Sequence, residues 1–353
     1  MDKKRALSLG LRIAISVGLL VFLFAQIPEF EFEELVPEWK SSTPWWLAGA
    51  LGLMIGSMIV SVVRWYEVGH GIGVTVPIRR YFSHYMAGQF VSNFVPTTVG
   101  GDVLRVTRLS KDSNDSPHSF ASVVFERLSG WLVLPAISFV GFIANPGLRD
   151  LGVSTRVAML TGAATLVGLV LVLLVAGNDA TGRLLERREG IFRWINAIHV
   201  GLDELRKQPR ALWRILAAGF AYQLVLLSAV FCAARAIGIE QVGLTALLAF
   251  LPAVLIVQVL PLGIGGLGVR EGAFVLFFGS LGVPDEQSIA LGFLVYLLTV
   301  VSSLIGFPSL ILGGRNGSDE AEAVEVDEAD AVRHRPRAGS SGVATGSPSP
   351  EAG

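Results

Sequence analysis

Residues 96–105 read PTTVGGDVLR, and residues 261–270 read PLGIGGLGVR. Both stretches fit the pattern P-x3-G-G-x3-R without a gap. Asn93 and Gln258 place a polar amide three residues before the Pro of each copy. Because internal self-similarity is the signature of a repeated architecture, the two copies predict a chain built from two related units.

The composition is that of an integral membrane protein. The chain has 353 residues, of which 52% are hydrophobic and 16% are charged, whereas soluble domains are about 25% charged. A net charge of −1 argues against nucleic acid as a partner, since backbone binding needs a concentrated basic face. The single cysteine, Cys232, excludes an intramolecular disulfide.

Six apolar segments reach the length of about 20 residues that a bilayer crossing needs. They are residues 7–27, 44–66, 119–144, 156–177, 211–235 and 287–312. Two further apolar regions, 80–111 and 243–282, are interrupted by Gly, Pro and polar residues, so neither half of either region can cross alone. Such backbone is tolerated at membrane depth only where protein or a wet cavity surrounds it. The sequence therefore predicts an all-α membrane protein with six transmembrane helices and two re-entrant helical hairpins.

The placement of Lys and Arg predicts the orientation in the cytoplasmic membrane. Residues 3–5 read KKR, which places the N-terminus in the cytoplasm, and seven Lys and Arg residues place segment 180–210 on the same side. Region 80–111 is basic at both ends and should dip in from the cytoplasm, whereas 243–282 should enter from the outer face. The C-terminus then finishes in the cytoplasm.

This parity predicts an inverted repeat, because each broken region lies between the second and third spans of a three-span unit. The first unit covers residues 1–144 and the second covers residues 145–312. An acidic, Ser/Pro-rich tail at 313–353 should be disordered. A simpler alternative is that the Gly–Gly pairs only permit close helix packing.

Segment 180–210 carries an apolar stripe at helical spacing beneath a basic face. Two interpretations stay open: an amphipathic helix on an anionic leaflet, or a linker helix packed on the bundle.

The first broken region has the residues of an anion site. Pro96 interrupts the helix and frees carbonyl groups, and Gly100 and Gly101 permit a tight turn and close approach of a ligand. Asp102 is placed to cap the next half-helix, whose N-terminus favours anions. Arg105 and Arg108 follow on one face, three residues apart, so the region predicts a cationic pocket for a phosphate or a similar head group.

Further ionisable residues stand close to both copies. Glu126 could pair with Arg105 or Arg108, and Asp102 could pair with Arg127; the alternative is a purely structural salt-bridge cluster.

In the second copy, the adjacent Arg270 and Glu271 form the candidate outer counterpart. On the half-helix entering the first copy, Gln89 and Asn93 share a face and should line the cavity. His84 fits an interfacial residue better than a proton relay.

No catalytic constellation is recognisable. His, Cys and carboxylate residues do not fall at metal-ligand spacings, no Gly-rich phosphate loop carries its Lys, and no G-x-S-x-G elbow occurs. The sequence thus predicts no metal or other cofactor, and favours a non-enzymatic function without excluding chemistry on a lipid phosphate.

Three ordered motifs resemble one known family. They are GQFVSNFVPTTVGGDVLRVTRL at 88–109, VVFERLSGW at 123–131 and LPLGIGGLGVREGAF at 260–274. They resemble the transmembrane domain of lysylphosphatidylglycerol synthases and its stand-alone flippase-like relatives. The resemblance implies that, in the full synthases, such a domain moves an aminoacylated phospholipid between leaflets, while a separate cytosolic domain makes that lipid. Only a short tail follows the last span here, so we expect no synthase activity.

The resulting hypothesis is a flippase-like translocase for an anionic phospholipid or a polyprenyl-phosphate-linked lipid. The alternative, suggested by relatives linked to lipid-carrier glycosylation, is a membrane enzyme or accessory subunit acting on a polyprenyl-phosphate-linked sugar. Candidate partners are a lipid with an anionic head group, a lipid-modifying enzyme or glycosyltransferase, and further copies of the chain. The candidate substrate-binding residues are Gln89, Asn93, Pro96, Gly100, Gly101, Asp102, Arg105, Arg108, Glu126, Arg127, Gln258, Pro261, Gly265, Gly266, Arg270 and Glu271.

Overall fold

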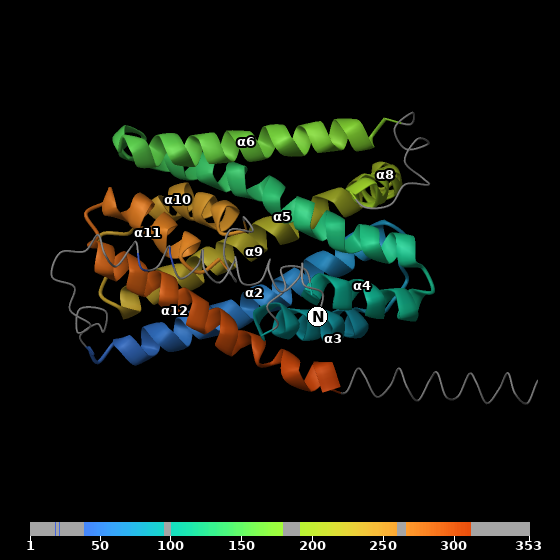
Figure 1. Cartoon of the computed structure of the whole chain (residues 1–353), viewed down its shortest axis with the longest axis horizontal. Helices are drawn as coiled ribbons and strands as arrows, with labels where there is room; N and C mark the ends of the chain where they lie inside the picture. Colours follow the sequence, from blue (N-terminus) through green and yellow to red (C-terminus); the bar gives the residue numbers. More distant parts are fainter. Residues whose placement is uncertain are drawn as a thin grey trace, which may run out of the picture. The chain divides into compact units, whose positions relative to one another are not determined.

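The computed structural model describes residues 39–94, 100–178, 191–259 and 266–311, together with Gly18 and Val21, and gives only the backbone of 191–197. Within these segments the chain forms helices and no strand (Figure 1), which confirms the all-α class for the described part. The chain divides into two units, residues 1–310 and 311–353, and every helix named below belongs to the first. The predicted tail and most of the predicted span 7–27 lie outside the described residues.

Five of the described helices are long and apolar enough to cross a membrane. They are α2 (Thr43–Gly71), α5 (Ser116–Ala144), α6 (Val153–Ala176), α9 (Pro209–Ala236) and α12 (Asp285–Ser303). Pro44, Pro117 and Pro209 stand in the first turns of α2, α5 and α9, where the missing N–H costs no helical hydrogen bond. Five predicted spans are therefore helices long enough to cross.

The last predicted span, 287–312, is not one continuous helix. α12 ends at Ser303, residues 304 and 305 form a turn, and residues 306–310 are helical again. Pro308 is the cause, because in a continuous helix its ring would clash with the carbonyl of Leu304.

Each predicted broken region contains two short helices. Region 80–111 holds α3 (Ile78–Phe94) and α4 (Gly100–Ser113), and region 243–282 holds α10 (Leu244–Val257) and α11 (Val269–Gly279). At 1.5 Å per residue the longest, α3, is about 26 Å long, shorter than a hydrocarbon core of about 30 Å. None of the four can cross a bilayer alone.

The remaining elements are a 3-10 helix, η2 (Pro146–Asp150), between α5 and α6, and the amphipathic α8 (Ile191–Arg206) before α9. α8 packs against α5, α6 and α9 and buries Ile198 and Leu205. Gly201 makes the contact with α5 close, since a Cβ there would lie 2.7 Å from Cδ2 of Phe125. Within the described part of segment 180–210, the helix packs on the bundle, as the linker interpretation expects.

The helices pack in corresponding pairs. α2 runs along α9 through the middle of the bundle (Figure 1), while α5 packs on α10 and α12 packs on α3. The contact between α5 and α10 is close because Gly141 leaves room for the backbone of Ala249, and Ser138 Oγ donates a 2.6 Å hydrogen bond to the Ala249 carbonyl. Small residues of this kind commonly bring membrane helices together.

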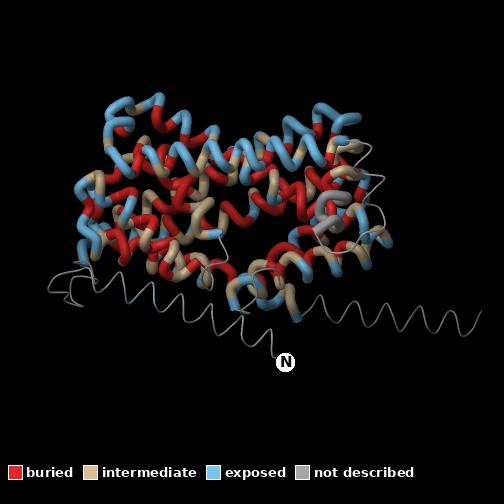
Figure 2. Tube along the Cα trace, turned by 45° about the horizontal axis from the view of Figure 1, so that its top comes forward, coloured by how far each residue is buried: buried red, intermediate tan, exposed pale blue. Residues whose placement is uncertain are grey.

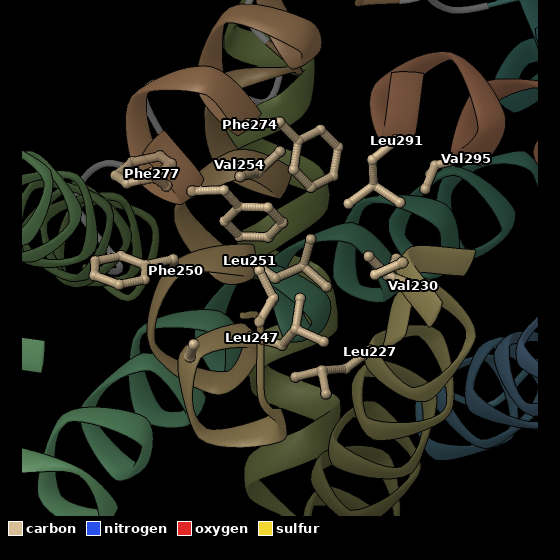
Figure 3. Packing of buried hydrophobic residues seen from close by; sticks show 14 of the residues in the cluster. Leu227, Val230, Leu247, Phe250, Leu251, Val254, Phe274, Phe277, Leu291 and Val295 are labelled. Atoms are coloured by element: carbon tan, nitrogen blue, oxygen red, sulfur yellow. The ribbon is translucent and has the colours of Figure 1, made fainter. Parts of the chain in front are cut away.

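Two hydrophobic clusters fill the bundle, one at each helical hairpin. The first gathers side chains of α10, α11 and α12, and Figure 3 shows Phe274 of α11 beside Leu291 of α12. The second surrounds α3 and α4 and includes Tyr81 and Leu109. α2, α5, α6 and α9 contribute to both clusters.

The surface of the bundle is strongly apolar along α6. Only 17% of its most apolar 18-residue window is buried, and Figure 2 shows the blue, exposed face of several helices. Leu160, Val167 and Leu174 are among the exposed side chains of α6. Large exposed apolar faces of this kind mark contact with a membrane or another protein.

Candidate functional site

Glu126 lies at the centre of a buried ion cluster, where α5 packs against α2 and α4. Its Oε2 accepts hydrogen bonds of 3.2 Å from both Nη1 and Nη2 of Arg105 on α4. Its Oε1 accepts from Nη2 of Arg64 on α2 and from the Ser61 hydroxyl. The exposed fraction is 6% for the Arg64 side chain and 3% for those of Arg105 and Glu126, and pairing is what makes such burial tolerable.

Aromatic rings flank both arginines of this cluster. The Arg105 guanidinium lies over Trp65 at 4.1 Å and over Tyr85 at 4.8 Å from the ring centroids. The Arg64 guanidinium lies 4.7 Å from the ring centroid of Tyr222 on α9. Cation–π contacts strengthen when they are desolvated, so the rings hold both guanidinium planes in place.

A second ion pair adjoins the first. Asp102, in the first turn of α4, accepts from Nη2 of Arg127 at 2.8 Å and from Nε at 3.1 Å. It also accepts from Nη1 of Arg105 at 3.3 Å. The cluster therefore holds three arginines and two carboxylates, a net charge of +1.

Several buried donors of the cluster are unsatisfied by the described residues. Nε and Nη1 of Arg64 and Nε of Arg105 have no hydrogen-bond partner within that part of the chain. Leaving a buried donor unpaired costs about 1–3 kcal/mol. Unpaired guanidinium donors and a surplus positive charge together suit an anionic ligand.

Glycines let the cluster assemble. A Cβ at Gly130 of α5 would lie 2.9 Å from Nη1 of Arg64, and a Cβ at Gly88 of α3 would lie 2.8 Å from Cγ of Arg105. A Cβ at Gly101 would overlap the carbonyl of Gly88 and the hydroxyl of Ser92. Gly101 thus brings α4 against α3, as the packing interpretation of the Gly–Gly pair expects.

The second copy of the motif forms a smaller buried pair. Arg270 donates to Oε1 of Glu271 from Nη2 at 2.7 Å and from Nε at 3.2 Å, and its guanidinium lies 5.0 Å from the ring centroid of Tyr296. Oε2 of Glu271 accepts the Gly268 N–H at 2.6 Å at the start of α11. Both charged side chains are buried, and their charges balance.

The two copies differ in backbone. Gly101 lies in the first turn of α4, whereas its counterpart Gly266, with φ +77°, precedes α11 in a left-handed conformation that glycine adopts at no steric cost. Gln258 is the C-cap of α10, and its carbonyl lies 3.1 Å from where a Cβ of Gly266 would be.

Other predicted site residues lie outside these clusters. Arg108 donates to the carbonyls of Ser309 and Leu310, so it does not join Arg105 at Glu126. Asn93 donates to the carbonyl of Gln89 on its own helix, and both side chains are half-buried. Pro96, Pro261 and Gly265 lie outside the described residues.

Sequence reasoning missed Arg64. It stands near the end of the predicted span 44–66, and the repeat could not reveal it because Val230 occupies the equivalent position of α9. The available signal was the rule that an ionisable residue inside a membrane span is costly and is usually retained for function.

The family can be read from the whole length of this bundle. The sequence model described as the lysylphosphatidylglycerol synthase TM region matches residues 9–306. This chain belongs to that family. Both ion clusters and all five long apolar helices fall inside the matched segment, so this member of the lysylphosphatidylglycerol synthase TM family is a multi-pass membrane protein.

The chain is also similar to a UPF0104 membrane protein of Methanothermobacter thermautotrophicus. It is 25% identical over 317 residues, which cover 84% of this chain and 90% of the relative. The similarity between this chain and its relative therefore extends over the bundle as a whole.

Proposed function

We propose that this protein is a flippase-like lipid translocase. It moves an anionic phospholipid or a polyprenyl-phosphate-linked lipid between the leaflets of the cytoplasmic membrane. The head group passes through the protein, while the acyl or prenyl chains remain in the bilayer.

The observation that carries this proposal is the buried cluster of Arg64, Arg105 and Glu126. It places unpaired guanidinium donors and a surplus positive charge between helices whose outer faces suit lipid. Ionisable groups at such depth are expensive and usually serve a pathway for an ion or a substrate. Guanidinium groups match the oxygen geometry of a phosphate.

An inverted-repeat arrangement supports a pathway reaching both leaflets. Helices recur at matching intervals, because the start of α3 at Ile78 follows that of α2 at Thr43 by the same interval that separates Leu244 of α10 from Pro209 of α9. We propose six spans and two re-entrant hairpins in units 1–144 and 145–312. Broken helices of such repeats meet near the midplane in transporters.

The termini lie in the cytoplasm in this arrangement. Arg105 then faces a head group arriving from the inner leaflet, and Arg270 faces one at the outer leaflet. The Arg270–Glu271 pair is the second head-group binding site of the same pathway.

The proposal predicts that Arg105→Ala and Arg270→Ala each abolish leaflet exchange. The measurement is dithionite quenching of a fluorescent phosphatidylglycerol, and of a fluorescent polyprenyl phosphate, in proteoliposomes. Exchange is normalised to the folded fraction from thermal melting in detergent, because each variant leaves a buried carboxylate short of a partner. Arg105→Lys keeps the charge and should retain part of the activity.

The matched control is Arg214→Ala, which removes an arginine whose side chain is 56% exposed and pairs with Glu67 at 3.1 Å. It should exchange lipid at the wild-type rate. Exchange that is unchanged in both Arg105→Ala and Arg270→Ala would refute the mechanism. Conversion of a polyprenyl-phosphate-linked sugar by purified protein in detergent would favour the enzyme alternative.

A further inference from the structure

We propose that the cluster around Glu126 binds its anion together with one proton, and that Glu126 carries this proton. The inference rests on the translocase proposal and names the second species that the same site takes up. It follows from which donors Glu126 occupies and from what else surrounds it.

Glu126 already occupies the position that suits an anionic head group. It engages both terminal nitrogens of Arg105 and one terminal nitrogen of Arg64. A phosphate that binds these nitrogens in the bidentate manner typical of guanidinium groups must displace the carboxylate. The displaced carboxylate would lose both of its ionic partners at once.

Binding without displacement leads to the same result. The donors without a described partner, Nε and Nη1 of Arg64 and Nε of Arg105, belong to the guanidinium groups that hold Glu126. A phosphate bound there stands beside the carboxylate. A like charge at such short range disfavours the ionised carboxylate, so both modes of binding favour protonated Glu126.

The surroundings offer no replacement cation among the described residues. The charged and titratable groups facing Glu126 are Arg64 on α2, Tyr85 on α3, Asp102 and Arg105 on α4, Arg127 on α5 itself and Tyr222 on α9. Tyr85 and Tyr222 are neutral phenols, and Arg127 already makes two hydrogen bonds to Asp102.

The other neighbours of α5 contact it elsewhere or through apolar groups. α8 approaches it at Phe125 and, through Glu204, at His118 near the start of α5, while α6 approaches it at Pro135 and α10 at Gly141. An ionised Glu126 that has lost its arginines would be a buried, uncompensated charge, which is strongly unfavourable. Proton uptake removes that charge.

The test counts protons during binding. Purified full-length protein in detergent is titrated with dihexanoyl phosphatidylglycerol and with farnesyl phosphate at pH 8, in buffers of different ionisation enthalpy. Calorimetry then gives the number of protons taken up per bound lipid. We expect a value approaching one for the wild type. Its Kd should rise by up to tenfold per pH unit wherever Glu126 is ionised in the free protein and protonated in the complex.

Glu126→Gln should bind with no proton uptake and with a pH-independent Kd for the phosphodiester. Glu67→Gln is the matched control, because it removes a carboxylate of another ion pair on α2, and it should behave as the wild type. Saturable wild-type binding without proton uptake would overturn this inference and leave the translocase proposal intact. Proton uptake that persists in Glu126→Gln on binding dihexanoyl phosphatidylglycerol, a phosphodiester that cannot itself take up a proton at pH 8, would also overturn it.

Failure of the wild type to bind either lipid would overturn both proposals. If Glu126→Gln does not fold, the proton count of the wild type still decides, since a carboxylate that swings away ionised would give no uptake.

Discussion

Arg64 and Arg105 share one carboxylate, and this sharing sets the properties of the site. Each arginine keeps part of its donor set for another acceptor, while Glu126 offsets half of the charge of the two arginines. A fully paired site would have no free donor for a ligand, and two unpaired arginines would make burial prohibitive. With one carboxylate shared by two arginines, the pairing of the site is intermediate between these two cases.

Removal of Arg64 tests this balance. Arg64→Gln should lower the free energy of unfolding by about 1–3 kcal/mol, because Oε1 of the buried Glu126 loses its charged donor. Unfolding in mixed micelles of detergent and sodium dodecyl sulfate measures the change.

Arg214→Gln is the comparison, since its pair with Glu67 is largely exposed on the arginine side. Exposed pairs contribute about 0–1 kcal/mol. Equal losses in the two variants would contradict the structural importance assigned to Arg64.

At the scale of residues, the sequence indicated ion pairs between residues that lie near recognisable motifs, but it did not reveal the isolated Arg64. It offered the Glu126–Arg105 and Asp102–Arg127 pairs among its alternatives, because those residues flank motifs close in the chain. It placed Arg105 and Arg108 on one face, but the two positions still lie about 60° apart around the helix, because three residues turn it by about 300°. That difference sends Arg108 to the carbonyls of Ser309 and Leu310.

The α3–α4 hairpin depends on the absence of side chains at its crossing. Gly88 faces the stem of Arg105, and Gly101 faces the carbonyl of Gly88 and Ser92. The two helices approach closely because neither position carries a Cβ. The crossing also places Arg105 within reach of Glu126.

Substitution at this crossing should separate the hairpin. Gly101→Ala forces backbone against side chain, and overpacking of this kind costs about 1–3 kcal/mol. Lower thermal stability in detergent is the expected outcome.

Gly52→Ala is the matched control, because it also lies within a helix but has nothing within 4 Å of the new methyl group. Removing a helical glycine there should be neutral or stabilising by up to about 1 kcal/mol. A harmless Gly101→Ala would contradict the close packing of α3 and α4.

At the scale of elements, the breaks in the chain were readable and one helix end was not. Pro and Gly clusters located both helical hairpins, since these residues interrupt helices for steric reasons. The end of α12 was placed too late because Pro308 lies within an otherwise apolar run. Ser302 and Ser303 reinforce that end, since their hydroxyls bond the carbonyls of Thr299 and Val300, and such bonds compete with helix continuation.

The bundle as a whole has two cores linked by four shared helices. Each core is centred on one helical hairpin, and α2, α5, α6 and α9 contribute buried residues to both. Composition and span length predicted the helical membrane class. The pairing of α5 with α10 and of α12 with α3 was beyond reach, because it depends on small residues meeting across long sequence separations.

Opposite entry of the two hairpins can be tested with matched surface positions. Thr75 precedes α3, Gln241 occupies the equivalent position before α10, and both are exposed. In a Cys232→Ala background, Thr75→Cys should react with a membrane-impermeant maleimide only from the cytoplasmic side. Gln241→Cys should react only from the outside.

Labelling of intact cells and of inverted membrane vesicles distinguishes the two sides. The Cys232→Ala parent, which retains no cysteine, sets the background. Reaction of both positions from the same side would rule out the inverted arrangement.

Arg108 fastens the last described turns of the bundle to its first helical hairpin. Its guanidinium binds the carbonyls of Ser309 and Leu310, which lie far along the chain. Gly306 lies directly against the carbonyl of Met86, and the ring centroids of Phe307 and Phe90 are 5.4 Å apart. During synthesis, these contacts of the α3–α4 hairpin can therefore form only after residues 306–310 have left the ribosome. A chain truncated before Gly306 would lack these contacts. Phe90 would lose its packing partner Phe307 and would be more accessible to quality-control proteases.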